Sequence, residues 1–168
     1  MRAPALALML ALLVAAPAEA RRADPGRSVV MVQAPRLAPG TNGSAPLYGE
    51  LRDQGSFVLV APVSGVSTGN AIHDTLIKQV LRGSVTLESG PPRLTWQNGI
   101  VRRFVSSGTL KVGASASRVP LTIRTITKPE GIYMQTYCLV PLARYGVVGL
   151  NGAAPGDVRV AINAFFPR

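Results

Sequence analysis

The sequence is poor in the residues from which catalytic sites, metal sites and disulfides are built. It contains one cysteine, one histidine and eight acidic residues in 168 positions. The single cysteine, Cys138, excludes a disulfide within the chain. It lies in a run, 132–140, with the composition of a buried strand, where an isolated cysteine usually acts as a small apolar residue. A reactive thiolate needs a nearby base, and His73 is far away in sequence, so we expect Cys138 in the core.

The common catalytic and cofactor-binding patterns are also missing. His73 precedes Asp74, but adjacent residues of a helix point in different directions and do not pair. The scattered carboxylates lack the spacing of metal ligands, and segment 63–70 is not followed by the Gly-Lys-Ser/Thr of a nucleotide loop. Glu88 and Glu130 could form an acid pair for glycoside hydrolysis, but no pattern selects them. The sequence therefore predicts a protein that is not an enzyme and that uses no cofactor or metal.

The first twenty residues have the three parts of a secretory signal. Arg2 is followed by an uncharged apolar run over 3–16, then by Pro17 and the small-x-small sequence at 18–20. The run is shorter than the about 20 apolar residues of a membrane anchor, and no second run of that length follows. We therefore expect a cleaved signal peptide over 1–20, export to the periplasm or the extracellular surface, and no transmembrane span in the mature chain.

The chain has a formal net charge of +10, carried mostly by arginine. Such a surface attracts anionic partners over a Debye length. Outside the cytoplasm these would be acidic glycans, lipid head groups or acidic proteins, whereas export argues against nucleic acid. The alternative is that the arginines reflect compositional bias and solubility only.

After removal of the signal peptide, we expect the chain to consist of a flexible N-terminal segment, 21–46, with a possible strand at 28–34, and a single β-rich domain, 47–168. Short β-type runs follow one another in that domain, at 57–63, 85–88, 93–97, 100–106, 109–113, 118–127, 132–140, 147–150 and 157–166. Asn98-Gly99 predicts a type I′ hairpin with Trp96 opposite Val101, and Arg103 on the same face indicates an edge or a bulge.

One segment has the pattern of a helix. Asn70 is suited to cap it, Asp74 and Lys78 have i, i+4 spacing, and Gly83 follows its end. The apolar stripe consists of Ile72, Leu76, Ile77, Val80 and Leu81. The expected fold class is mainly β, an antiparallel β-sandwich or barrel-like domain with one short helix.

Alternation in the runs 118–127 and 157–166 places arginines on one face and aliphatic residues on the other. If these strands are neighbours, their outward arginines form a cationic patch. The candidate anion- or partner-binding residues are Arg118, Arg124, Arg159, Arg102, Arg103 and Tyr133. The alternative is an ordinary solvated sheet face, or arginines that guard an edge against aggregation.

Three functions remain open from the sequence. The first is an exported, non-enzymatic envelope protein, a subunit or accessory factor of a surface appendage or secretion apparatus, because peripheral strands such as 28–34 and the C-terminal strand suit donation between subunits. The second is a periplasmic or secreted binding or inhibitor module whose arginine face binds an acidic polymer, a lipid surface or a protein. The third is a hydrolase with an unrecognised site.

Overall fold

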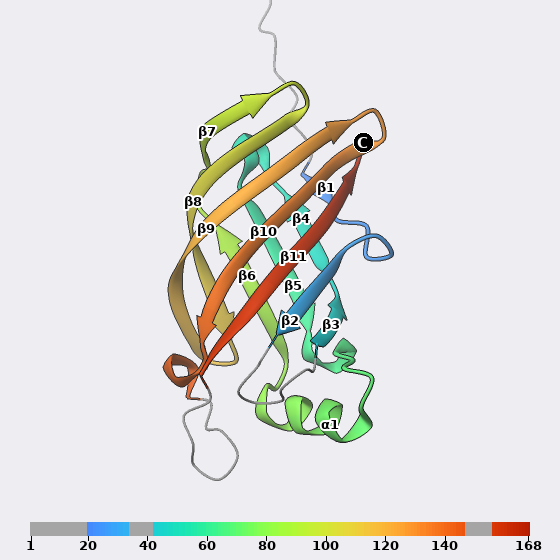
Figure 1. Cartoon of the computed structure of the whole chain (residues 1–168), viewed down its shortest axis with the longest axis vertical. Helices are drawn as coiled ribbons and strands as arrows, with labels where there is room; N and C mark the ends of the chain where they lie inside the picture. The colour runs from blue at the N-terminus through green and yellow to red at the C-terminus, as the bar shows by residue number, and fades with distance from the viewer. Residues whose placement is uncertain (1–19, 34–41, 147–155) are drawn as a thin grey trace, which may run out of the picture.

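A computed structural model describes residues 20–33, 42–146 and 156–168, which form one short helix and a curled antiparallel β-sheet (Figure 1). The strands are β1 (Arg21–Arg22), β2 (Val29–Gln33), β3 (Asn42–Pro46), β4 (Tyr48–Leu51), β5 (Phe57–Pro62), β6 (Ser84–Ser89), β7 (Arg93–Asn98), β8 (Val101–Val112), β9 (Ser115–Lys128), β10 (Gly131–Pro141) and β11 (Asp157–Pro167). The helix is α1 (Ala71–Val80), and short 3-10 turns are η1 (Asp53–Gly55), η2 (Val63–Gly65) and η3 (Leu142–Tyr145).

Two of the elements expected from the sequence, the signal peptide and the strand at 147–150, lie outside the residues that the structure describes. Within the described ranges, no helix is long and apolar enough to cross a membrane.

The sheet has the strand order β1-β4-β5-β6-β8-β9-β10-β11-β2-β3, and β7 pairs with β8 beside this path. It curls into a half-barrel, so the barrel-like arrangement agrees with the structure and the sandwich is not confirmed. β3 and β4 are separated by a single residue, Leu47, which is 2% exposed. Because β3 and β4 stand near opposite ends of the strand order, this residue brings the two ends of the curl together.

The curl separates a buried apolar inner face from an exposed outer face of mixed polarity. Period-2 alternation in β9, β10 and β11 sends Leu121, Met134 and Ile162 inward, where all are buried. Phe57 and Phe166, both fully buried, complete the core from β5 and β11. The inward sets predicted for β9 and β11 are thus confirmed.

β8 is one continuous strand where the sequence predicts two, 100–106 and 109–113. Gly108 lies in the middle and does not break it, because the space of its missing side chain is filled by a neighbour. A Cβ at Gly108 would stand 2.6 Å from Cδ1 of Leu121 on β9. The glycine allows this close packing inside the curl rather than a turn.

The β7–β8 turn differs from the expected one by one residue. Asn98 pairs with Val101, so the two turn residues are Gly99 and Ile100. Gly99 has φ +55°, whereas Ile100 has no positive φ. A type I′ turn needs positive φ at both positions, so that prediction is wrong.

The predicted bulge is present between Leu94 and Trp96, and it places Trp96 opposite Arg103 rather than Val101.

The segment 21–46, predicted to be flexible apart from a possible strand at 28–34, contains a further strand. Residues 42–46 form β3, which pairs with β2, and Ser44 exchanges two main-chain hydrogen bonds of 2.8 Å with Ser67. β2 in turn lies between β11 and β3, and β11 lies between β10 and β2. Neither strand is peripheral, which removes the structural reason for expecting strand donation between subunits.

The helix begins where the sequence predicts. The Asn70 side chain accepts hydrogen bonds from the main-chain N–H groups of Ile72 and His73, at 2.9 and 3.3 Å. Ile72, expected in the apolar stripe, is 71% exposed, so its side chain does not contribute to a buried face of α1. α1 lies at one end of the half-barrel and the β7–β8 hairpin at the other (Figure 1).

Candidate functional site: the inner face and the outer arginines

One row of side chains crosses the inner face from solvent to core. Register places its members opposite one another on seven strands, and we call them the inner row: Leu94, Phe104, Ile123, Thr136, Ile162, Val30 and Ala45. Leu94 on β7 is 48% exposed, Phe104 is half-buried, and Ile123 is 2% exposed. The row is therefore an apolar strip from Leu94, on the accessible edge strand β7, to Ile123 in the interior, and Thr136 beyond it is its one polar member.

The few polar groups on the inner side of the sheet are already hydrogen-bonded. Thr136 donates through Oγ1 to the carbonyl oxygen of Thr122 at 3.0 Å, and Ser89 Oγ accepts from the N–H of Phe57 at 2.8 Å. In the part of the chain that the structure describes, no buried side-chain nitrogen or oxygen lacks a partner. The interior consequently offers contact with apolar surface and leaves little free hydrogen-bonding capacity.

The cysteine is suited to packing rather than to reaction. Cys138 is 6% exposed on the inner side of β10, opposite Val160. Burial raises the pKa of its thiol to about 11, so the neutral form dominates at physiological pH. Across residues 20–33, 42–146 and 156–168, no three His, Cys, Asp or Glu side chains gather in a way that could hold a metal ion.

Asp74, in the first turn of α1, is hydrogen-bonded to Thr68 just before the helix. Asp74 accepts from the side chain of Thr68 at 2.6 Å and from its N–H at 2.7 Å. The side-chain bond first, and the main-chain bond second, lower the pKa of Asp74. Asp74 thus stabilises the start of α1, at the end of the molecule opposite the β7–β8 hairpin.

The structure separates the predicted arginine cluster into parts. β9 and β11 are not neighbours, because β10 lies between them, so the expected direct patch of Arg118, Arg124 and Arg159 is not formed. All three lie on the outward side of their strands, as alternation predicts. Arg118 and Arg124 are six residues apart along β9, which corresponds to about 20 Å, and Arg159 stands opposite Leu139.

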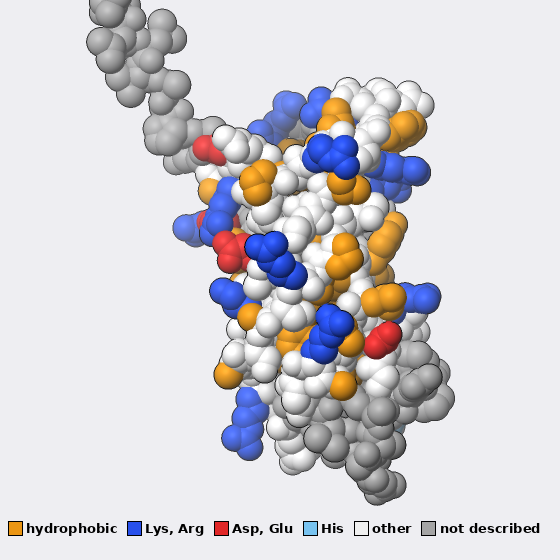
Figure 2. All heavy atoms as spheres, turned by 90° about the vertical axis from the view of Figure 1, so that its left-hand side faces the viewer, with side chains coloured by type: hydrophobic (Ala, Val, Ile, Leu, Met, Phe, Trp, Pro, Cys, Tyr) orange, Lys and Arg blue, Asp and Glu red, His pale blue; other side chains and the backbone are white. Residues whose placement is uncertain are grey.

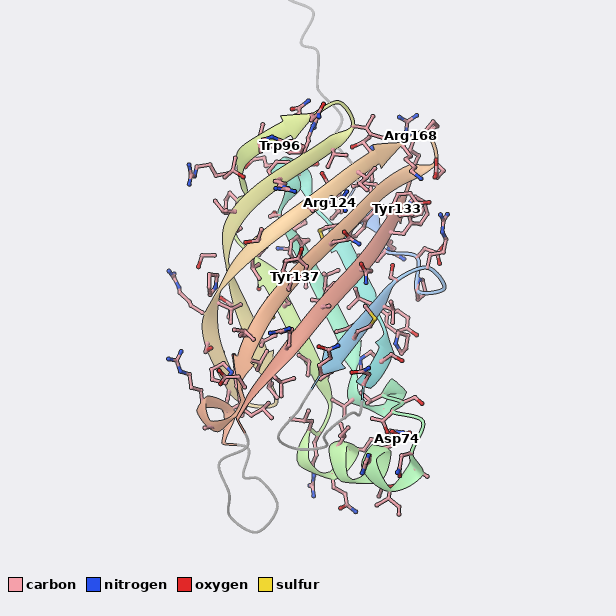
Figure 3. The ribbon with its side chains drawn as sticks, viewed as in Figure 1. Asp74, Trp96, Arg124, Tyr133, Tyr137 and Arg168 are labelled. Carbon is pink, nitrogen blue, oxygen red and sulfur yellow. The ribbon has the colours of Figure 1, made fainter. Side chains whose placement is uncertain are left out.

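A second row crosses the outer face, and it contains two of the predicted arginines. Register places these five side chains in line on β7 to β11, and we call them the outer row: Trp96, Arg103, Arg124, Gln135 and Asn163. Trp96 and Arg124 are labelled in Figure 3.

Contacts within the outer row hold its two guanidinium groups in place. That of Arg103 lies 5.0 Å from the centre of the Trp96 ring, and Arg124 donates to Gln135 Oε1 at 3.2 Å. Gln135 is itself fixed, because its Nε2 donates to Asn163 Oδ1 at 3.0 Å.

Arg103 and Arg124 are directly opposite each other in the register of β8 and β9. Like charges in this position destabilise a sheet, and a bound anion between them would remove the repulsion. Arg102 pairs with Thr125 and is exposed next to the hairpin turn.

Sequence reasoning missed Trp96, Gln135 and Asn163, since their alignment depends on the register of five strands. The one available signal was that Trp96 is the single tryptophan of the chain.

Tyr133 belongs to a separate cluster on the outer face. Its hydroxyl donates to Glu130 at 3.0 Å and accepts from Arg27, whose guanidinium stacks 3.6 Å from the Phe165 ring centre. Burial first, and the bond to Glu130 second, raise the pKa of Tyr133. Lys128 lies 5.0 Å from the Tyr133 ring centre. These contacts attach the segment before β2 to β10 and β11.

Comparison with solved structures shows the same fold in two proteins of low sequence identity. BcnA of Burkholderia cenocepacia matches with a TM-score of 0.69 and 12% identity, over 85% of this chain and 98% of its own. A polyisoprenoid binding domain from Saccharophagus degradans, implicated in plant cell wall breakdown, matches with a TM-score of 0.69 and 13% identity, over 89% and 99% of the two chains.

Sequence comparisons add no relative. No protein-family model matches the chain, and no curated protein matches it in sequence. The likeness of this chain to BcnA and to the Saccharophagus domain is thus a likeness of fold.

Proposed function

We propose that this chain is a non-enzymatic binding module that holds a lipid-type ligand with a long apolar chain against the inner face of its half-barrel. We further propose that it acts after export, in the periplasm or at the cell surface. The observation that carries the proposal is the inner row, in which an apolar strip begins at half-exposed Leu94 and passes Phe104 to reach buried Ile123.

The chemistry of the interior supports a ligand of this class. An apolar chain gains about 0.8 kcal/mol for each methylene group that leaves water, and it requires no hydrogen-bond partner. The inner polar groups already bond within the protein, as Thr136 and Ser89 show. Met134, on the inner side of β10, has the flexible side chain that adapts to an irregular apolar neighbour.

The fold comparison supports the same class. The Saccharophagus protein is described as a polyisoprenoid binding domain, and this chain matches 99% of its length. We take a polyisoprenoid, a long branched hydrocarbon with a polar end group, as the first ligand to test. The raised pKa of Cys138 argues against a nucleophilic role for this inner-face thiol.

The experiment compares two exchanges of leucine for aspartate on opposite faces of the sheet. Leu94→Asp places a charge in the inner row, whereas Leu139→Asp places it on the outer face of β10, and both leucines are about half-exposed, at 48% and 58%. Binding of a polyprenyl phosphate is measured by native mass spectrometry and by displacement of a fluorescent fatty acid. We expect a loss of at least tenfold in affinity for Leu94→Asp and little change for Leu139→Asp.

Each variant is first checked for an unchanged circular dichroism spectrum and urea midpoint. Equal affinities in the wild type and Leu94→Asp would contradict the inner-row site, and absence of binding by the wild type would contradict the ligand class.

A further inference from the structure

The end of the molecule that carries the β7–β8 hairpin (Figure 1) combines exposed apolar side chains with positive charge. Trp96 is 44% and Ile100 is 55% exposed, on β7 and in the hairpin turn. Arg103 and Arg124 lie opposite each other on the outer side of β8 and β9, whereas Arg102, next to Arg103 on β8, points to the inner side at the tip of the hairpin. We call these five residues the hairpin patch.

The segment of chain that carries the hairpin patch has charge of one sign. Residues 89–129 contain seven lysines and arginines and no aspartate or glutamate. The carboxylate in the adjacent β9–β10 turn, Glu130, already accepts a hydrogen bond from Tyr133, and Lys128 and Arg27 act on it electrostatically. Figure 2 shows Lys and Arg side chains interspersed with hydrophobic ones on this side of the molecule.

The hairpin is held in place, so the hairpin patch is a preformed surface. The N–H of Thr127 on β9 donates to the carbonyl oxygen of Ile100 at 3.0 Å, which fixes the turn to the sheet. The bulge turns Trp96 onto the outer face, where its ring lies against Arg103. Tryptophan and arginine side by side match the interface of a bilayer, where the ring occupies the head-group level and the guanidinium meets phosphate.

We propose that the hairpin patch docks the protein on an anionic lipid surface, with Ile100 and Trp96 entering the interface and the arginines contacting head-group phosphates. A second copy of the chain would bring two purely cationic hairpins together, which repels them. Nucleic acid would satisfy the arginines but would leave the aliphatic side chain of Ile100 without an apolar environment. The docking proposal is independent of the inner-row ligand, since none of the five patch residues belongs to the inner row.

The test uses Trp96, the single tryptophan, as its own reporter. The exported form is used, because the apolar run at 3–16 would itself enter a bilayer. On addition of vesicles containing phosphatidylglycerol, we expect the emission to shift to shorter wavelength and to be quenched by brominated acyl chains. Vesicles of phosphatidylcholine alone should give little change, and added salt should weaken the response.

Matched variants locate the surface. Arg102→Ser/Arg103→Ser should lower the vesicle partition constant about 25-fold, from about fivefold for each arginine. Lys78→Ser/Arg82→Ser removes the same charge at the α1 end and should change it less than about fivefold. Ile100→Ser should weaken partition about tenfold, whereas Ile72→Ser, an exposed isoleucine of α1, should not.

Four results would overturn the docking proposal. Equal losses in the two double variants would mean attraction by net charge alone, and an unshifted Trp96 emission with bound vesicles would place the contact elsewhere. A shift that depends on protein concentration without vesicles would assign the hairpin patch to self-association. An equal response to a DNA oligonucleotide would assign it to nucleic acid. Leu94→Asn disturbs the inner row without adding a charge to the hairpin, so loss of ligand binding with retained docking, or the reverse, separates this proposal from the proposed function.

Discussion

Replacement of Cys138 by alanine should change how the stability of the protein depends on pH. The thiol is buried on the inner side of β10, and its pKa is raised from an ordinary 9.0 to about 11 by burial. In the unfolded chain the thiol loses its proton near pH 9, whereas in the folded chain it keeps the proton until about pH 11. Between these values the folded state binds more protons, so stability falls as pH rises.

The size of the effect follows from the two pKa values. The stabilising contribution is complete below pH 9 and is lost as pH rises through 11. At pH 10 the loss is on the order of 1 kcal/mol, because one pKa unit corresponds to about 1.4 kcal/mol. Cys138→Ala has no titrating thiol. The free energy of unfolding that this variant loses through poorer packing is the same at every pH. The wild type should therefore lose about 1 kcal/mol more than Cys138→Ala between pH 7.5 and pH 10.

The assay is urea unfolding of both proteins at pH 7.5, 9 and 10. Lysine and tyrosine titrate in the same range, but they are present in both proteins, so the difference between the two curves isolates Cys138. Thiol labelling at pH 8 gives a second measure, since two pKa units make the folded thiolate about 100-fold scarcer than the unfolded one. Parallel pH curves for the two proteins, or labelling of native protein as fast as in denaturant, would refute the buried-thiol argument.

Three further predictions concern maturation, packing and the helix cap. The exported protein should begin at Arg21, which intact-mass measurement of material from outside the cytoplasm decides; a mass that retains 1–20 contradicts the signal peptide. Gly108→Ala should cost about 1–3 kcal/mol in urea unfolding, because its Cβ would meet Leu121, and the same change made in a Leu121→Ala background should cost less. Asn70→Ala should cost about 1 kcal/mol, because it removes the Oδ1 that accepts from two main-chain N–H groups at the start of α1; an unchanged midpoint would show that the cap contributes nothing.

The sequence by itself determined the local features of this protein. Alternation fixed which residues of β9 and β11 face inward, because the two faces of a strand are set by the chain and not by its partners. Asn70 marked the start of α1, since capping depends on residues within one turn. The apolar context of Cys138 likewise predicted a buried thiol. Each of these predictions needs only neighbours in sequence.

Tertiary structure alone decided how the strands combine into a surface. β10 separates β9 from β11, so the arginine patch expected from two adjacent strands is divided, and Arg124 is instead aligned with Arg103 and Trp96. That alignment depends on a bulge and on pairing between segments distant in sequence. A shift of one residue in the register would turn every side chain of the strand to the opposite face of the sheet. β3 became a strand despite its sequence, because β2 and Ser67 supplied partners for its main chain. Strands pair through main-chain hydrogen bonds, which all residues share, and the paired segments are distant in sequence. The composition of a single segment therefore does not determine which strand it pairs with.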